Sequence, residues 1–376
     1  MPAHDPEPLR SAGLRLAGVP LPLVGVARVY VCGITPYDVT HLGHAATFVW
    51  ADTLAAVVRA AGVDSAVARN VTDVDDVLTD AAERRGLPYD ELALTGEFAF
   101  ERDMAALGVQ RVDVAPRARA HVGQVVELAA ALLAIGAAYE RDGEVWFRGA
   151  EVAHASGLDL DEARRLSAEF GEAATGDDPW DVPVWRRSAA DHPAWPSPWG
   201  WGRPGWHAEC AAMAWSALGS GVDVLLGGAD LAWPHHAYQA AMVERASGAT
   251  PFARVRMHVG TVHHQGAKMA KSTGNLVLVE DLVRRTSGAA VRLMLLDRPW
   301  REEWAYEPAL LAEAAARLER LYAAAGRPAD DVAAAEAQGR VLDLLLDDLA
   351  VPAALDLAER EGGAYARAAL SLLRLT

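Results

Sequence analysis

The sequence contains little cysteine, no long hydrophobic run and no surplus of positive charge. Its 376 residues include only two cysteines, so a disulfide scaffold is excluded and a reducing compartment is favoured. The longest apolar stretch, LAAALLAIGAAY, is too short to cross a bilayer. The formal net charge of −16 argues against a broad electrostatic grip on a polyanion.

The first ten residues, MPAHDPEPLR, lack the basic segment that opens a secretory signal. The chain is 52% apolar, which is enough to bury a large core in two or three domains. We therefore expect a cytoplasmic protein without membrane contact, and we expect it to be a monomer.

Between residues 27 and 248, segments with strand patterns and segments with helix patterns follow one another. The run ARVYVCG predicts a buried strand, HLGHAATFVWADTLAAVVRAAG a helix, and VDSAVARNVTDVDD a second strand that ends in a polar turn. Further on, HAECAAMAWSALG and HHAYQAAMVERASG predict helices on either side of a strand in VDVLLGGADL. This order indicates an α/β fold of the doubly wound nucleotide-binding type.

Two histidines stand where the first strand gives way to the first helix. His41 and His44 are three residues apart and share one face of the first helical turn, where backbone N–H groups favour an anion. Gly43 between them leaves room for a purine or ribose. The pattern suits phosphate binding, but on its own it is equally compatible with an ordinary helix start that carries two surface histidines.

Two lysines, Lys268 and Lys271, lie three residues apart in the loop HHQGAKMAKSTGNLV. Two ammonium groups on such a loop can close on a triphosphate and neutralise the departing pyrophosphate. Two lysines on a loop are also common at a solvated surface, so the pairing with the upstream histidines is what favours nucleotide chemistry.

HLGH and KMAKS resemble the two ATP motifs of class I aminoacyl-tRNA synthetases. The blocks YVCGITPYDVTHLGHAAT, NVTDVDD, GRPGWHAEC, GGADLAWPHH and KMAKSTGNLV resemble, in order, the cysteinyl-tRNA synthetases. They are more similar still to the tRNA-independent relatives of those enzymes, the cysteine ligases of the mycothiol pathway, and the CGITP wording favours the ligases. The resemblance runs from about Tyr30 into the helical tail.

The resemblance implies a zinc ion, one per chain, held by Cys32, Cys210 and His235, with a fourth position open for the thiolate of substrate cysteine. This donor set suits zinc, and zinc selects a side chain that ionises readily. Spacing alone does not pair the two cysteines, because no CxxC motif is present; two unrelated buried cysteines are the alternative. Gln239 stands where the synthetases usually add a glutamate ligand.

The resemblance also implies a pocket for ATP, with Mg²⁺, and for the cysteinyl-adenylate. Trp206 is expected as an aromatic wall, with packing in a Trp-rich loop as its alternative role. Asp230 is expected to bind ribose or an amine. The other residues expected in this pocket are Gly33, Ile34, Thr35, Gly43, Thr47, Asn70, Val71, Thr72, Gly228, Ala229 and Val262.

The chain departs from the family at four places. Ala270 replaces the serine of KMSKS, which predicts slower activation, and Thr273 stands where the ligases usually have arginine. Ala237 replaces a glutamate after the histidine pair, and FGEAATGDDPWD only loosely resembles the ligases' insertion motif. These changes concern the identity of the acceptor more than the activation of cysteine.

Three functions remain open from the sequence. The first is an AMP-forming ligase that activates L-cysteine with ATP and transfers it to the amine of glucosaminyl-inositol, or a paralogue that uses another small amine in specialised metabolism. The second is a cysteinyl-tRNA synthetase, which the short tail and the acidic balance disfavour, so no tRNA is expected. The third is a non-catalytic nucleotide-binding relative, although both motif histidines, both motif lysines and all three expected zinc ligands are present.

The resemblance implies a class I aminoacyl-tRNA synthetase-like Rossmann core with an insertion and a helical C-terminal domain. We expect the first half of the core at 1–107, the insertion at 108–190, the second half with the KMAKS loop at 191–286, and the helical domain at 287–376.

Overall fold

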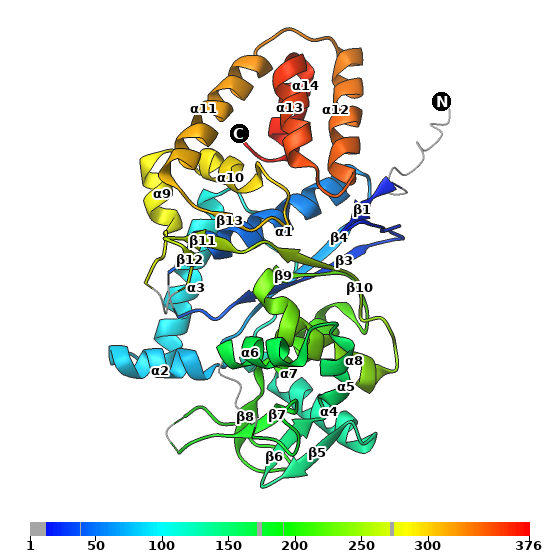
Figure 1. Cartoon of the computed structure of the whole chain (residues 1–376), viewed down its shortest axis with the longest axis vertical. Helices are drawn as coiled ribbons and strands as arrows, with labels where there is room; N and C mark the ends of the chain where they lie inside the picture. The colour runs from blue at the N-terminus through cyan, green and yellow to red at the C-terminus, as the bar shows by residue number, and fades with distance from the viewer. Residues whose placement is uncertain (1–12, 38, 171–174, 191, 271–273) are drawn as a thin grey trace, which may run out of the picture.

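Four parallel strands form the central sheet, in the order β10-β9-β3-β4. They are β3 (Ala27–Ile34), β4 (Ser65–Val71), β9 (Val222–Gly228) and β10 (Ala253–Val259). The structure, a computed structural model, describes residues 13–37, 39–170, 175–190, 192–270 and 274–376 (Figure 1). The expected strands and the parallel α/β sheet are confirmed.

The chain changes direction across this sheet between β3 and β9. From β3 it passes through α1 (Leu42–Ala60) to β4 on one side, whereas β9 is followed by β10 on the other side. Ligands of open parallel sheets bind outside the carboxyl ends of the strands at such a reversal. The topology therefore predicts a site near Cys32 and Gly228, which lie in the last residues of β3 and β9.

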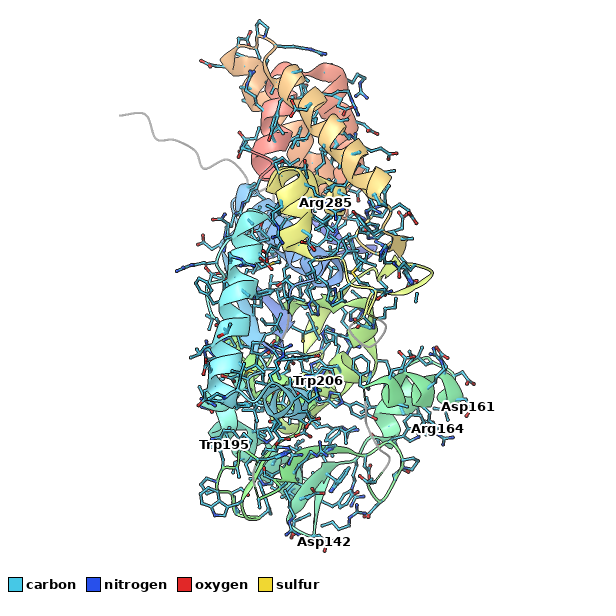
Figure 2. All side chains as sticks on the ribbon, turned by 90° about the vertical axis from the view of Figure 1, so that its left-hand side faces the viewer. Asp142, Asp161, Arg164, Trp195, Trp206 and Arg285 are labelled. Atoms are coloured by element: carbon cyan, nitrogen blue, oxygen red, sulfur yellow. The ribbon has the colours of Figure 1, made fainter. Side chains whose placement is uncertain are left out.

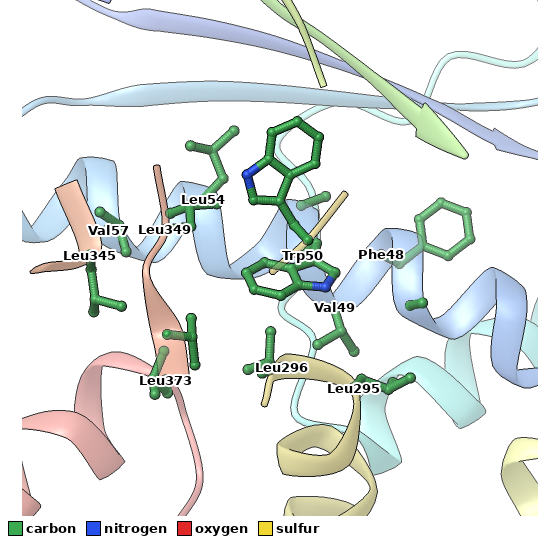
Figure 3. Close-up of a cluster of buried hydrophobic side chains, with 14 of the residues drawn as sticks. Phe48, Val49, Trp50, Leu54, Val57, Leu295, Leu296, Leu345, Leu349 and Leu373 are labelled. Carbon is green, nitrogen blue, oxygen red and sulfur yellow. The ribbon is translucent and has the colours of Figure 1, made fainter. Parts of the chain in front are cut away.

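Helix α1 is buried between the sheet and the C-terminal helices. Its residues Val49, Trp50 and Leu54 are buried; Figure 3 shows Leu54 on the side of the sheet and Val49 on the side of Leu296, which belongs to α10 (Gly288–Leu296). A helix that is apolar on nearly all sides belongs in the interior. This packing fixes the orientation of α1, and with it the position of the two histidines at its N-terminal end.

A buried ion pair joins the same two helices. Arg292 of α10 is fully buried and places Nη2 2.6 Å from Oδ2 of Asp52 on α1. Its Nε donates to the carbonyl oxygen of Leu373 at 2.7 Å, and Arg374 also pairs with Asp52. The C-terminal residues Leu373 and Arg374 are thus tied to α1 by charged hydrogen bonds as well as by apolar packing.

A second sheet is inserted between β4 and β9. It is antiparallel, in the order β5-β6-β7-β8, and it forms the lower end of the molecule in Figure 1. Its strands are β5 (Ala138–Arg141), β6 (Glu144–Phe147), β7 (Val182–Arg187) and β8 (Gly202–Pro204). The helices between β4 and β9 are α2 (Asp76–Arg85), α3 (Tyr89–Ala106), α4 (Val122–Ala134), α5 (Ala150–Ala155), α6 (Leu160–Glu169) and α7 (Trp206–Leu218).

The sequence analysis did not foresee this antiparallel sheet. Strands β5 and β6 are four residues each, too short for a clear period-2 pattern. Asp142 and Gly143 join them with φ of 54° and 80°, which is the Asp-Gly signature of a tight hairpin. That dipeptide was the available signal.

The remaining elements follow β9 or precede β3. A short hairpin of β1 (Arg15–Leu16) and β2 (Val19–Pro20) opens the described chain. After β9 come η3 (Ala229–Leu231), η4 (Ala232–His236), α8 (Ala237–Ser247), β11 (Val262–His264), β12 (Ala267–Lys268), α9 (Val279–Arg285) and β13 (Trp304–Ala305). The tail is helical as expected, with α11 (Pro308–Ala325), α12 (Asp331–Leu346), α13 (Val351–Glu361) and α14 (Gly363–Leu372). Among the described residues, no helix is both long and apolar enough to span a membrane.

Candidate active site

A cavity of about 960 Å³ lies at the carboxyl ends of the four parallel strands. Its lining brings together nearly all of the residues that the sequence analysis selected: Cys32, Gly33, Ile34, Thr35, His41, Gly43, His44, Thr47, Asn70, Thr72, Trp206, Cys210, Gly228, Ala229, Asp230, His235, Val262 and Lys268. Val71 does not line it; this residue is buried in β4, where it pairs with Ile34. Lys271 lies outside the described residues.

Three potential metal ligands meet in the floor of the cavity. Cys32 comes from β3, Cys210 from α7 and His235 from η4, and their donor atoms lie within 4.8 Å of one another. All three side chains are buried, and both cysteines are free thiols. Residues from three separate elements converge here, which no spacing along the chain reveals.

The protonation preferences of this cluster suit a cation. The hydrogen bond with Cys32 and burial raise the pKa of the Cys210 thiol, and repulsion from a thiolate at Cys32 raises it further. Burial lowers the pKa of His235, so its imidazole is neutral, as a metal ligand must be. A divalent cation would supply the positive charge that allows both thiols to ionise. The residues present therefore fit zinc.

A second layer of polar side chains holds the three donors. His236 Nε2 lies 3.1 Å from Cys32 Sγ, and its Nδ1 lies 2.9 Å from His258 Nε2. Asn70 Nδ2 donates to Cys210 Sγ at 3.5 Å, while Gln239 Oε1 accepts from Cys32 Sγ at the same distance. Such contacts orient metal ligands and tune their basicity.

His207 completes this layer on the other side of the cluster. Its Nδ1 lies 2.8 Å from Nδ1 of His235. The sequence analysis did not select His207, His236 or His258. The WH pair at 206–207 was a signal for His207, and the HH doublet at 235–236 was a signal for His236. Nothing in the sequence near His258 marks that residue.

Trp206 forms a wall beside the cluster. Its ring stacks on the imidazole of His235 with centroids 4.0 Å apart and an interplanar angle of 24°. The ring of Phe170 also lies next to Trp206, and the centroids of these two rings are 5.4 Å apart. In Figure 2, Trp206 lies between Arg285, toward the helical end, and Asp142, at the tip of the inserted sheet. The expected aromatic wall is therefore next to the thiols.

The HLGH segment forms the N-terminal end of α1. His41 is the N-cap and His44 belongs to the first turn, and their rings stack with centroids 3.9 Å apart. A Cβ atom on Gly43 would lie 3.1 Å from the His41 ring, so glycine keeps this surface open. His41, Gly43 and His44 thus line the cavity at the N-terminal end of α1, which is an arrangement suited to phosphate.

Strand β3 approaches its parallel neighbour β4 so closely at Gly33 that only glycine fits. A Cβ atom on Gly33 would lie 1.7 Å from the carbonyl oxygen of Asn70. The Gly33 amide also donates to Oδ1 of Asn70 at 2.9 Å, and Asn70 Nδ2 donates to Thr72 Oγ1 at 3.1 Å. Asn70 therefore joins the backbone beside Cys32 to the side chain of Cys210.

The lysine loop reaches the opposite rim. Lys268 Nζ lies 2.7 Å from Oδ2 of Asp230, which stands two residues after the end of β9. Asn275 fixes the base of the loop: its Nδ2 donates to the carbonyl oxygens of His264 at 2.8 Å and Lys268 at 3.1 Å, and its Oδ1 accepts from the Ala270 amide at 3.0 Å. Sequence reasoning missed this role of Asn275.

Comparison with known families and proteins agrees with this geometry. Residues 23–316 match the family described as tRNA synthetases class I (C) catalytic domain. The L-cysteine:1D-myo-inositol 2-amino-2-deoxy-alpha-D-glucopyranoside ligase of Acidothermus cellulolyticus is 44% identical over 344 residues, covering 88% of this chain and 83% of that protein. The ligase of the same name from Mycolicibacterium vanbaalenii is also 44% identical, covering 88% and 79%.

Solved structures share the fold at low sequence identity. Mycobacterium tuberculosis methionyl-tRNA synthetase in complex with methionyl-adenylate superposes with a TM-score of 0.63 at 19% identity, over 94% of this chain and 82% of that one. The LeuRS of Agrobacterium radiobacter K84 gives 0.64 at 12% identity, over 93% and 83%. The class I architecture with an insertion and a helical tail is thereby established for this chain.

Proposed function

Because the chain belongs to the class I (C) tRNA synthetase family and, within it, to the cysteine ligases that it matches at 44% identity, we propose that it is an ATP-dependent cysteine ligase. In this function it activates L-cysteine as cysteinyl-adenylate and transfers the cysteinyl group to the amine of glucosaminyl-inositol. The observation that carries the proposal is the meeting of the Cys32–Cys210–His235 cluster, the HLGH turn and Lys268 in one cavity.

Zinc would be held by Cys32, Cys210 and His235, where it would bind the thiolate of substrate cysteine and so select cysteine over serine. The protein residues around it have separate tasks. Trp206 covers the side of the amino acid pocket, and Asn70 and His236 hold the two thiols in place.

Activation takes place between the pocket and the HLGH turn. The carboxylate of cysteine attacks the α-phosphate of ATP, a carboxyl–phosphate bond forms, and the bond to pyrophosphate breaks. His41 and His44 donate hydrogen bonds to the phosphates at the N-terminal end of α1, and Lys268 and Lys271 offset the charge of the leaving pyrophosphate. Mg²⁺ accompanies the nucleotide.

Transfer uses the adenylate as the acyl donor. The lone pair of the acceptor's neutral amine attacks the cysteinyl carbonyl carbon, so that a C–N bond forms. The C–O bond to AMP breaks, AMP leaves with the electron pair, and the nitrogen loses one proton to solvent. The products are an amide and AMP.

The test supplies cysteine, ATP and either glucosaminyl-inositol or tRNA, and it follows the products by mass spectrometry. We expect amide from glucosaminyl-inositol and no aminoacylated tRNA. Charging of tRNA with cysteine and no amide would contradict the proposal. Adenylate formation without transfer to either acceptor would indicate a ligase for a different small amine.

A further inference from the structure

The cavity extends beyond the cysteine pocket toward the inserted sheet. This extension, the acceptor lobe, is lined by Asp75 and Asp76 at the start of α2, Arg186 on β7, Arg203 on β8 and Glu209 on α7. None of these residues has a task in the activation of cysteine described above. The lobe is continuous with the cysteine pocket, because the same cavity is lined by both sets of residues, and at their junction Asp75 Oδ2 accepts from Thr35 Oγ1 at 2.9 Å.

The far end of the lobe carries a carboxylate held by two guanidinium groups. Asp76 Oδ1 lies 2.7 Å from Arg203 Nε, and Oδ2 lies 2.9 Å from Arg203 Nη2 and 3.0 Å from Arg186 Nη1. Arg203 makes the bidentate contact and is mostly buried, so it fixes Asp76 in place. Arg186 is 44% exposed in its side chain and has Asp76 as its one partner among the described residues, which leaves N–H donors facing the lobe.

The near end of the lobe contains a buried polar atom without a partner. Glu209 is 1% exposed, and its Oε2 makes no hydrogen bond with any described residue. Leaving such an atom unpaired costs free energy, so a ligand group that donates to it is favoured. Glu209 directly precedes Cys210 and lies three residues after Trp206, which places this end of the lobe beside the cysteine pocket.

We propose that this lobe binds the acceptor, a small amine that carries several hydroxyl groups, with its amine beside Glu209 and its polyol part against Asp76 and Arg186. This inference rests on the proposed function and adds the location and the chemistry of acceptor recognition. The N–H groups of the amine donate to Glu209 Oε2, next to where the cysteinyl carbonyl lies. Neighbouring hydroxyls of the polyol donate to the Asp76 carboxylate and accept from Arg186.

The experiment compares glucosaminyl-inositol with glucosamine, which has the amine but lacks the second ring. Wild-type protein is expected to show a lower KM for glucosaminyl-inositol. Arg186→Ala should raise that KM on the order of 10-fold or more, because a hydrogen bond to a charged group is lost, and leave the KM for glucosamine unchanged. Arg187→Ala, the same change at the next residue of β7, is the control, since Arg187 does not line the cavity.

A second variant addresses the amine end. Glu209→Gln keeps the shape of the side chain but replaces one acceptor oxygen with an N–H donor, so it should raise the KM for both amines. Zinc content and cysteine-dependent ATP–pyrophosphate exchange report on folding and on the adenylate site, in which neither Arg186 nor Glu209 has been placed. A higher KM for cysteine in exchange would assign Glu209 to the cysteine pocket and overturn its role in the lobe.

The outcomes separate this inference from the proposed function. Amide formation by the wild type, with an unchanged preference for glucosaminyl-inositol in Arg186→Ala, would overturn the acceptor lobe alone. Normal cysteine-dependent ATP–pyrophosphate exchange by the wild type, with no amide from either amine, would overturn the proposed function. It would also overturn the assignment of this acceptor to the lobe. Loss of the preference in Arg186→Ala, with Arg187→Ala normal, is the result that supports the lobe.

Discussion

The ammonium group of Lys268 lies 2.7 Å from the carboxylate of Asp230, and both residues line the cavity of the candidate site. The lysine belongs to the loop proposed to act on pyrophosphate, and the carboxylate is expected to meet ribose or an amine. Both side chains are partly exposed, at 43% and 37%, so the pair is weak enough to exchange for a nucleotide. ATP binding is therefore expected to move Lys268 from Asp230 to the phosphates.

Amine labelling tests this exchange. Lys268 and Lys271 are the only two lysines in the chain, so acetylation of lysine amines reports on this loop alone. We expect saturating ATP with Mg²⁺ to slow acetylation of both lysines, as peptide mass spectrometry of a time course will measure. Equal labelling rates with and without ATP would contradict contact between this loop and the nucleotide.

Removing one of these charges should slow the chemical step. In Lys268→Ala, the rate of cysteinyl-adenylate formation should fall on the order of 10²–10³-fold, because a charge aimed at the leaving group is lost. The KM for cysteine should change little, since cysteine is bound at the thiol–imidazole cluster. Pre-steady-state quenched flow measures the rate, with Lys268→Arg as the charge-preserving control.

The zinc assignment predicts about one zinc per chain in purified protein. Cys210→Ala should lose the metal and cysteine-dependent exchange together. His236→Gln removes a contact to Cys32 rather than a ligand, so its metal affinity should fall only about 10–100-fold. Elemental analysis and chelator competition measure both variants. Full exchange by a metal-free Cys210→Ala protein would refute the assignment.

The alanine in KMAKS offers a gain-of-function test. Ala270→Ser restores the hydroxyl that the family usually has at this position, beside the Ala270 amide that Asn275 holds at 3.0 Å. We expect a modest rise in the adenylation rate without a change in thermal stability. A fall in the rate would show that this loop is adapted to alanine.

The buried ion pair between Asp52 and Arg292 should dominate the attachment of the C-terminal helices. Arg292→Ala removes the buried partner of the Asp52 carboxylate and leaves Arg374 as its remaining charged partner, so the free energy of unfolding should fall by about 3 kcal/mol, at the low end for breaking a buried pair. The control is Arg284→Ala, which removes exposed pairs with Glu280 and Asp281 and should cost about 0–1 kcal/mol. Urea titration compares the two; equal effects would contradict the importance of burial.

The sequence predicted three of the four strands of the central sheet, β3, β4 and β9, because their signals are local. β3 and β9 are largely apolar runs that end near glycine. β10 was not predicted, because its apolar residues alternate with Arg254, Arg256 and His258. The inserted sheet was missed because β5 and β6 are too short for a period to show. The boundaries of the four expected domains stay predictions.

The candidate site was predicted from motifs, and its second layer was not. Family motifs selected the Cys32, Cys210 and His235 positions, which the fold brings within 4.8 Å. The contacts of His207 with His235 and of His236 with Cys32 depend on how α7 and η4 approach each other. Such distances between elements are set by tertiary packing, which no periodicity in one chain encodes.

The most direct test of the central claim is a single-turnover chase. Enzyme carrying preformed cysteinyl-adenylate is separated from ATP, mixed with glucosaminyl-inositol and quenched at intervals, and amide and AMP are quantified together. The account predicts that AMP and amide appear at the same rate and in equal amounts, and that tRNA in place of the amine gives neither. Release of AMP with free cysteine and no amide, or transfer of cysteine to tRNA, would contradict it.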